Sequence, residues 1–237
     1  MDERTEKILH DLEQLGDSQI KNIYINHGAR QPLFGVRTGD LKPLAKKYKN
    51  DYQLAKDLYN TGNYDAMYLA GMIIDTKLMT KEDFEEWMEK AYCQAIGDYT
   101  VAICLADSPL GQEIADSWIK VDSDLYKSAA YYSYSMMLTN LPDENFSKKK
   151  LESMLNYIEK EIHNEDNRTR YSMNSFVIAC GISYIPLHER AMEVAKNIGK
   201  VQVYMGNTSC KTPLATDYIN KAVNKGKLGY KRKNVRC

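Results

Sequence analysis

Apolar side chains recur at helical spacing along almost the whole 237-residue chain, and this pattern constrains the fold more than any other feature. No segment alternates apolar and polar residues over the length of a strand between two turn signals. Helices are expected near residues 2–15, 40–49, 52–60, 64–78, 81–95, 98–106, 109–120, 123–139, 148–162, 167–180, 187–198 and 213–225. The sequence therefore predicts an all-α protein.

Residues that start and stop helices recur between these segments. Side chains that cap the first turn of a helix are expected at Thr38, Asp51, Thr80, Ser108, Ser147 and Thr212. The prolines after Ser108 and Thr212 would then occupy the first helical position, where the missing N–H costs nothing. Glycines suited to the end of a helix stand at Gly62, Gly181, Gly199 and Gly226.

Short connections make neighbouring helices antiparallel, and successive pairs of roughly 35–45 residues suit an α-solenoid of HEAT or ARM type. The periodicity fits an irregular bundle as well, because no repeat recurs residue for residue. No Gly/Ser-rich or Pro-rich linker divides the chain. We therefore expect one domain over residues 1–225, followed by a basic tail at residues 226–237.

Two segments depart from the helical pattern. Residues 24–37 place Gly28 and Pro32 between short apolar runs, which indicates a hairpin-like or irregular loop. The end of the chain, residues 225–237, has six basic residues and no acidic one. Its glycines suggest a flexible segment that becomes ordered on a polyanion.

The composition excludes several classes of protein. The first residues lack the basic and apolar regions of a signal peptide, and no apolar run is long enough to span a membrane, so we expect a cytoplasmic protein. The five cysteines form no C-x-x-C pair, the four histidines are widely separated, and no glycine-rich phosphate loop is present. These features predict no metal and no cofactor, and the absence of heptads predicts a monomer.

Charge is unevenly distributed although the net charge is zero. Residues 21–49 have a net charge of +6 and residues 196–237 one of +9, whereas residues 1–20 have −4 and residues 50–195 have −11. Two basic ends on an acidic body are compatible with a local surface that binds an anion. Solvated helix faces are the other interpretation of the same runs.

Four strings resemble the HEAT-like-repeat DNA alkylation repair proteins, the AlkD-like DNA glycosylase superfamily. They are Phe34-Gly35-Val36-Arg37-Thr38, Ile96-Gly97-Asp98-Tyr99, residues 170–178 and residues 208–213. The resemblance covers essentially the whole chain. It implies stacked helix pairs whose concave basic face holds duplex DNA, with active members excising N3- and N7-alkylated purines.

The resemblance also implies a catalytic Trp-Trp-Asp-x-x-Asp run that this chain departs from. Ile96 and Gly97 stand at the two tryptophans, Asp98 keeps the first acid, and Val101 replaces the catalytic acid. Valine has no charge with which to stabilise an oxocarbenium-like centre. Asp98 is therefore the one candidate catalytic residue. A second family tryptophan falls near Ser175, and a phosphate-contacting arginine falls near Ser128, so both positions weaken the site further.

The residues expected to contact DNA are basic and lie outside the acidic segments. They are Arg30, Arg37, Lys42, Lys46, Lys127, Arg168, Arg170, Lys211, Lys231, Arg232 and Lys233. The sequence favours a protein that binds the backbone and shape of DNA, including damaged, distorted or branched DNA, without efficient base excision. The alternatives are an active alkylpurine DNA glycosylase that uses Asp98, and a HEAT-type scaffold that binds another protein.

Overall fold

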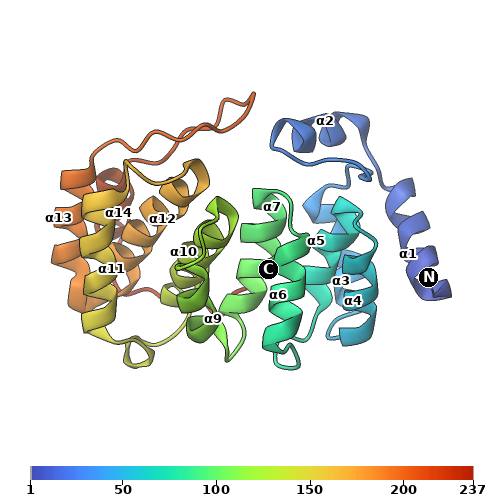
Figure 1. Ribbon diagram of the computed structural model, residues 1–237, viewed down its shortest axis with the longest axis horizontal. Helices are drawn as coiled ribbons and strands as arrows, with labels where there is room; N and C mark the ends of the chain where they lie inside the picture. The colour runs from blue at the N-terminus through green and yellow to red at the C-terminus, as the bar shows by residue number, and fades with distance from the viewer. Residues whose placement is uncertain (1, 237) are drawn as a thin grey trace. The chain divides into compact units, whose positions relative to one another are not determined.

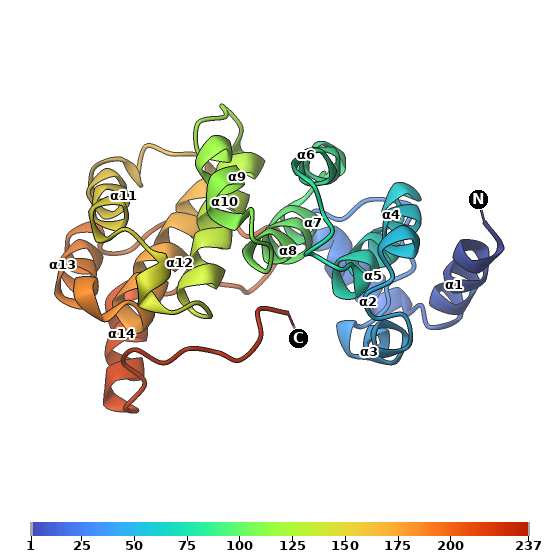
Figure 2. The same ribbon diagram turned by 90° about the horizontal axis from the view of Figure 1, so that it is seen from below.

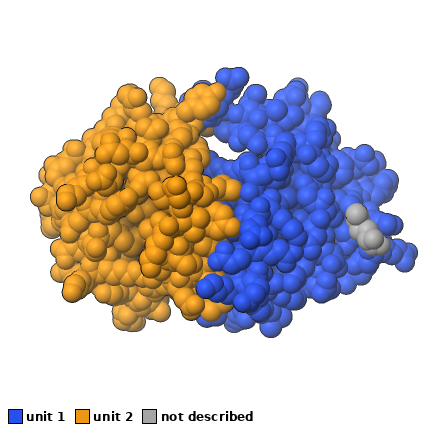
Figure 3. All heavy atoms as spheres, in the orientation of Figure 1, with its two compact units in different colours: residues 1–109, 205–209, 236–237 blue, residues 110–204, 210–235 orange. Residues whose placement is uncertain are grey.

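The computed structural model describes residues 2–236, and within that range it contains helices and loops but no strand (Figure 1). This confirms the all-α prediction. The described chain divides into two compact units, coloured separately in Figure 3. Unit 1 contains residues 2–109, 205–209 and 236, and unit 2 contains residues 110–204 and 210–235. The boundary expected at residue 225 between a domain and a tail stays a prediction.

Unit 1 consists mainly of short helices that follow one another along the chain. They are α1 (Glu3–Gln14), α2 (Ser18–Asn26), α3 (Thr38–Lys47), α4 (Tyr52–Asn60), α5 (Tyr64–Ile73), α6 (Lys81–Lys90), α7 (Gln94–Ile96), the π-helix η1 (Gly97–Ala102) and α8 (Ile103–Ala106). The helices α4 and α5 pack against each other, and α3 and η1 also pack on α5. The α5 helix buries most of its side chains and is the centre of this unit.

Unit 2 is built around two long helices. Its elements are α9 (Gly111–Trp118), α10 (Asp124–Leu138), the 3-10 turn η2 (Asp143–Asn145), α11 (Lys148–Glu161), α12 (Asn167–Ser183), the 3-10 turn η3 (Ile185–Leu187), α13 (His188–Ile198) and α14 (Ala215–Asn224). The most extensive packing in this unit is between α10 and α12. The α9 helix packs on α10, and α13 and α14 pack on α12. None of the helices formed by residues 2–236 is both long and apolar enough to cross a membrane.

Side-chain hydrogen bonds confirm three of the expected helix starts. Asp51 accepts a hydrogen bond from the Leu54 N–H, Thr80 forms a reciprocal box with Asp83, and Ser147 accepts from Lys150. The cap expected at Thr38 is wrong, because Thr38 is the first residue of α3 and this helix has no side-chain cap. The starts expected at Ser108 and Thr212 are also wrong. In both cases the helix begins later, at Gly111 and Ala215, so the prolines lie in the preceding loops.

Gly181 was expected to end a helix, and that prediction is wrong because α12 continues to Ser183. A Cβ atom added to Gly181 would lie 2.6 Å from Ile219 Cδ1 and 3.4 Å from Ala191 Cβ. The glycine therefore permits α13 and α14 to approach α12 closely. By contrast, Gly62, Gly199 and Gly226 have positive φ angles and follow helices, as predicted.

Residues 24–37 do not form a hairpin, and the irregular loop that the sequence also indicated begins only after Asn26. Residues up to Asn26 belong to α2, which Asp17 caps by accepting hydrogen bonds from Gln19 and Ile20. Ile20, Ile23 and Tyr24 follow one another at helical spacing in α2, although no residue of this helix is fully buried. The remaining residues, 27–37, form an irregular loop without strands.

Candidate nucleic-acid interface

The loop that precedes α3 is held by one buried carboxylate. Asp65, in the first turn of α5, is 1% exposed. Its two oxygens accept hydrogen bonds from the backbone N–H groups of Phe34 (2.6 Å), Gly35 (3.1 Å) and Val36 (2.8 Å). Bonds from N–H groups to a carboxylate are stronger than neutral ones. Asp65 therefore fixes the backbone immediately before Arg37.

Gly35 is required at the centre of this loop. Its φ angle is +88°, and an added Cβ would lie 2.5 Å from the Asp17 carbonyl oxygen and 2.6 Å from the Lys21 nitrogen. A side chain would thus be strained in backbone conformation and would also collide with the start of α2. The string around Gly35 that carries the family resemblance consequently has a structural role, which is to join α2 to α3.

This loop presents two of the expected arginines to solvent. The Arg30 guanidinium lies 4.3 Å from the centre of the Tyr92 ring, a cation–π contact. Arg37 is exposed and pairs with Asp17 at 3.1 Å. Hydrogen bonds from the Ile20 and Gln19 N–H groups, together with Arg37, hold the pKa of Asp17 below its ordinary value.

The α3 helix presents Lys42 and Lys46 one turn apart, and both are exposed. Neither ammonium group forms an ion pair with any residue in the described range 2–236. The nearest acid on the same helix is Asp40 in its first turn. Four of the expected DNA contacts therefore lie within residues 30–46 of unit 1.

The segment that corresponds to the catalytic run of active members lies inside unit 1. Its residues Ile96, Asp98 and Val101 are 0% exposed, and Gly97 is also buried. Residues 97–102 form a π-helix, a rare geometry that occurs often at functional sites. Asp98, the candidate catalytic residue, is thus inaccessible to a substrate in this conformation.

In unit 2, Asp124 joins the beginnings of α10 and α12. Its carboxylate accepts hydrogen bonds from the backbone N–H groups of Arg168 (3.0 Å) and Thr169 (2.7 Å) and from the Thr169 hydroxyl (2.9 Å). The two helices are tied again by the Ser128 and Ser172 hydroxyls, 2.8 Å apart. Asp124 therefore caps α12 from a neighbouring helix, a role that no local sequence pattern reveals.

This arrangement places Lys127, Arg168 and Arg170 at adjacent helix starts. All three are partly buried. The Arg168 guanidinium lies 4.9 Å from the centre of the Tyr171 ring, and the Arg170 Nε atom is buried. Ser175, at the position of a family tryptophan, donates a hydrogen bond to the Tyr171 carbonyl at 3.0 Å and provides no aromatic surface.

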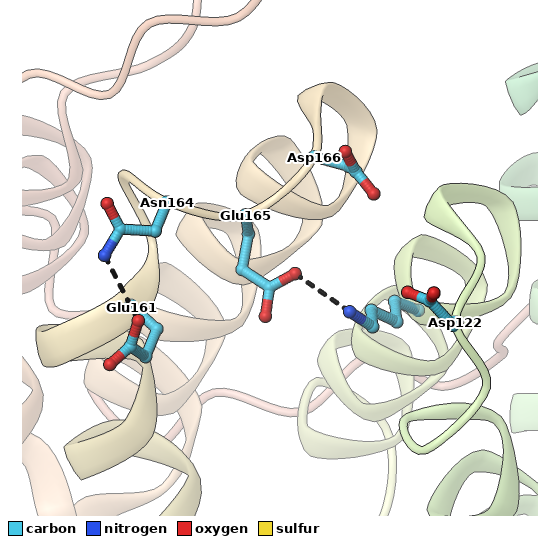
Figure 4. Close-up of a pocket in the computed structure, with 6 residues that line it drawn as sticks. Asp122, Glu161, Asn164, Glu165 and Asp166 are labelled. Atoms are coloured by element: carbon cyan, nitrogen blue, oxygen red, sulfur yellow. Dashed lines mark hydrogen bonds and ion pairs between the residues drawn. The ribbon is translucent and has the colours of Figure 1, made fainter.

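Lys127 lies in a pocket of about 310 Å³ whose other charged residues are all acidic (Figure 4). The pocket is lined by Asp122, Lys127, Glu161, Asn164, Glu165 and Asp166. The Lys127 ammonium pairs with Glu165 at 3.2 Å, and Glu165 also accepts a 2.6 Å hydrogen bond from the Tyr157 hydroxyl. That bond raises the pKa of Tyr157 to about 12. Four carboxylates around one ammonium disfavour a phosphate here.

The last expected contacts lie in loops and in the tail. Lys211 is exposed in the loop before α14. Lys231 donates a hydrogen bond to the Leu138 carbonyl (2.7 Å) and pairs with Asp143 (2.8 Å), whereas Arg232 and Lys233 are exposed. The tail was expected to be flexible, but Gly229 donates a hydrogen bond to the Ile182 carbonyl at 2.7 Å and lies close to Ile185. Its glycine therefore serves close packing.

Arg236 belongs to unit 1, and it has a role that the sequence did not reveal. Arg236 pairs with Asp107 at 2.9 Å and donates hydrogen bonds to the carbonyls of Gly71 (3.2 Å) and Ile74 (2.7 Å) at the end of α5. A cation at the C-terminal end of a helix satisfies carbonyls that lack partners within the helix. Among residues 2–236, no group of three or more potential ligands could hold a metal ion.

Comparison with known proteins agrees with this geometry. A sequence model of the family described as DNA alkylation repair enzyme matches residues 8–212. The uncharacterized protein Lmo0209 of Listeria monocytogenes is 37% identical over 223 residues, covering 92% of this chain and 96% of its own length. The uncharacterized protein Lin0241 of Listeria innocua is 35% identical, covering 91% of this chain and 95% of its own.

A solved structure matches over the whole of both chains, with a TM-score of 0.92 and 44% identity. It is described as belonging to a new family of proteins related to the HEAT-like repeat DNA glycosylases, with affinity for branched DNA structures. The fold match confirms the prediction of HEAT-like repeats and decides between the solenoid and the irregular bundle. The chain belongs to the DNA alkylation repair enzyme family, in its HEAT-like-repeat branch.

Proposed function

We propose that this protein binds DNA through the sugar–phosphate backbone, with a preference for branched or distorted DNA, and does not excise alkylated bases efficiently. The observation that carries the proposal is the burial of Ile96, Gly97 and Val101 where active relatives have two tryptophans and an acid. A buried aliphatic segment provides neither a platform for a cationic base nor a charge for the sugar. The exposed lysines of α3 and the affinity of the structural relative for branched DNA support the binding function.

Backbone contacts are the basis of this function. Exposed lysines that neutralise phosphates release counterions, so the affinity falls steeply with salt and depends little on base sequence. The contacts that we propose in unit 1 are Arg30, Arg37, Lys42 and Lys46, and those in unit 2 include Arg168, Arg170, Lys211, Arg232 and Lys233. We propose that a cytoplasmic monomer performs this function without metal or cofactor.

The test compares a four-way DNA junction with a linear duplex of the same total length. We expect the purified protein to bind the junction more tightly at low salt, with a log–log salt slope of several units, measured by fluorescence anisotropy. No binding to any linear, gapped or branched DNA at about 50 mM salt would reject the proposal. Release of free 7-methylguanine or 3-methyladenine above the spontaneous rate would reject its second half.

The second candidate function is glycosylase activity that depends on Asp98. It rests on the π-helix at residues 97–102, because such segments often mark functional sites. In this case the buried carboxylate must become accessible when DNA binds. Base release that disappears in the Asp98→Asn variant, with unchanged junction affinity, would establish this function in place of binding alone.

A further inference from the structure

The outer face of α14 is exposed and basic. The helix buries Ala215 and Ile219. Tyr218, Lys221 and Lys225 follow at spacings of three and four residues, so they share one face of α14 and its last turn, and all three are exposed. The Tyr218 side chain is 54% exposed, which is unusual for an aromatic residue that serves only packing.

The turn after α14 extends this face. Lys227 is exposed, and its ammonium lies 5.6 Å from the centre of the Tyr230 ring, which is itself 56% exposed. We call Tyr218, Lys221, Lys225, Lys227 and Tyr230 the α14 surface. None of its three ammonium groups pairs with a carboxylate of residues 2–236.

The tail fixes this surface in place. After Lys227 the backbone is held by Gly229, which donates to the Ile182 carbonyl at 2.7 Å, and by Arg232, whose N–H donates to the Thr139 carbonyl at 2.7 Å. Lys231 is used as an anchor against Leu138 and Asp143. The remaining lysines are therefore held on an ordered scaffold, which lowers the entropy that binding must remove. Figure 2 shows α14 and the start of the tail at one edge of unit 2.

The chemistry of the α14 surface fits a phosphate backbone. Asp217, in the first turn of α14, is the one acid among residues 196–236. Exposed ammonium groups contact phosphates, and exposed phenols donate hydrogen bonds to phosphate and sugar oxygens. In the same unit, the pocket around Lys127 has the opposite charge and disfavours phosphate. Unit 2 therefore has one face that attracts DNA and one that repels it.

We propose that the α14 surface binds the backbone of a second duplex arm of branched DNA, while the residues of the loop and α3 in unit 1 bind a first arm. The inference rests on the proposed function and deepens it. A branched DNA offers two duplex arms to one protein, and each arm occupies one basic surface. The second contact then acts at a high effective concentration, so it strengthens junction binding much more than duplex binding.

The test is the triple variant Lys221→Gln, Lys225→Gln, Lys227→Gln. Each lost phosphate contact reduces the magnitude of the slope of log affinity against log salt by about 0.9. Three lost contacts therefore reduce this magnitude for the four-way junction by about 2.7. The decrease in junction affinity between 50 and 200 mM salt then becomes smaller by a factor of about 40. The affinity for a linear duplex changes less than about twofold, because that duplex occupies unit 1.

The matched control replaces three lysines of α11, and it has the same change in charge. The control variant is Lys148→Gln, Lys149→Gln, Lys160→Gln, and all three residues are exposed and without ion pairs in the described range. We expect its junction binding to equal that of the unchanged protein. Both variants replace surface side chains, and circular dichroism with thermal unfolding verifies that each is folded.

The outcomes separate this inference from the proposed function. If the unchanged protein binds no DNA, the proposed function fails. If it binds the junction and the two triple variants behave alike, only the α14 surface is rejected, and its lysines and tyrosines then suit an acidic protein partner. If the α14 triple variant loses the same affinity for the junction and for the linear duplex, the proposal that the α14 surface binds a second arm is also rejected. Acetylation of lysines provides an independent measurement: junction DNA should protect Lys221, Lys225 and Lys227, and unchanged labelling of them would overturn the inference.

Discussion

The two units place their carboxylates differently around the residues expected to bind DNA. In unit 1 the carboxylate of Asp65 is buried, and it accepts hydrogen bonds from three backbone N–H groups of the loop before α3. The lysines of α3 remain without acidic partners in the described chain. In unit 2, Glu165 and three other carboxylates surround Lys127 in an open pocket. In unit 1 a carboxylate holds the loop that presents basic residues, whereas in unit 2 a carboxylate neutralises the basic residue itself.

This difference shows that a basic residue must be judged with its neighbours. Lys42 and Lys127 look equivalent in the sequence, as single lysines near the start of a helix. In the structure, the first faces solvent and the second is paired at 3.2 Å with a carboxylate. We therefore expect unit 1 to provide most of the phosphate contacts near the helix starts.

The largest effect is expected when the internal acid is removed. Asp65→Ala leaves three N–H groups without their acceptor, at a cost of about 1–3 kcal/mol for a buried unsatisfied group. We expect the free energy of unfolding to fall by roughly 3–5 kcal/mol, measured by urea denaturation. Asp65→Asn should cost less because it keeps one acceptor oxygen. Glu144→Ala, at an exposed position, is the control and should change stability by less than about 0.5 kcal/mol.

The next effect concerns the cations that the two units present. Lys42→Gln with Lys46→Gln should reduce the magnitude of the log–log salt slope for DNA binding by about 1.8, since two phosphate contacts are lost. Lys127→Gln should change the slope by less than about 0.5, because its charge is already balanced by Glu165. Anisotropy titrations at several salt concentrations measure both. If the salt slope changed by the same amount for each substituted lysine, Lys127 would contact phosphate as Lys42 and Lys46 do, and the two units would not differ in this respect.

A smaller effect should follow from neutralising the acid in unit 2. Glu165→Gln leaves the Lys127 ammonium free to reach a phosphate, and one added contact strengthens binding about threefold at moderate salt. The same change should lower the pKa of Tyr157 from about 12 towards about 10, since its hydroxyl no longer faces a carboxylate. NMR titration of labelled tyrosines, assigned with Tyr157→Phe, measures the pKa. Glu144→Gln, at an exposed position outside this pocket, is the control, and equal affinities for the two variants would contradict the role of Glu165.

The sequence predicted the helices of this fold well where an apolar stripe and a free capping side chain occur together. Asp51 and Thr80 are caps as expected. The α2 helix was missed although Ile20, Ile23 and Tyr24 have helical spacing. Gly181 was taken for the end of a helix because the residue that requires a glycine there, Ile219, lies 38 positions later in the chain. Periodicity indicates which face of a helix is buried, but it does not identify the residues of other helices that pack against that face.

The same limit applies to the candidate site. The basic residues and the loss of the catalytic acid at Val101 were visible in the sequence. The partners of those residues were not, since Arg37 pairs with Asp17, 20 positions before it, and Lys127 pairs with Glu165, 38 positions after it. Asp124 acts across a distance of 44 positions to cap α12. Charge can be counted along a chain, but its pairing depends on the tertiary structure.

The smallest effect concerns a third carboxylate, that of Asp83. It is buried, as Asp65 is, and it pairs with a lysine, as Glu165 does. Asp83 is nearly buried and accepts hydrogen bonds from the Lys56 ammonium and the Tyr52 hydroxyl, each at 2.5 Å. Burial alone would raise its pKa, but these bonds and the Thr80 N–H outweigh burial, so the pKa lies below its ordinary value. A depressed pKa stabilises the folded protein above the unfolded pKa of about 4, and this stability is lost as the pH falls through the folded value.

We therefore expect the unfolding free energy to fall between about pH 5 and pH 2 more steeply in the unchanged protein than in Asp83→Asn. Urea denaturation at each pH measures the difference. In Lys56→Met the carboxylate keeps its burial and loses its cation, so its pKa should rise and the acid-induced loss should become smaller. Parallel stability curves for all three proteins would mean that the ion pair between Lys56 and Asp83 contributes nothing to the pH dependence of stability.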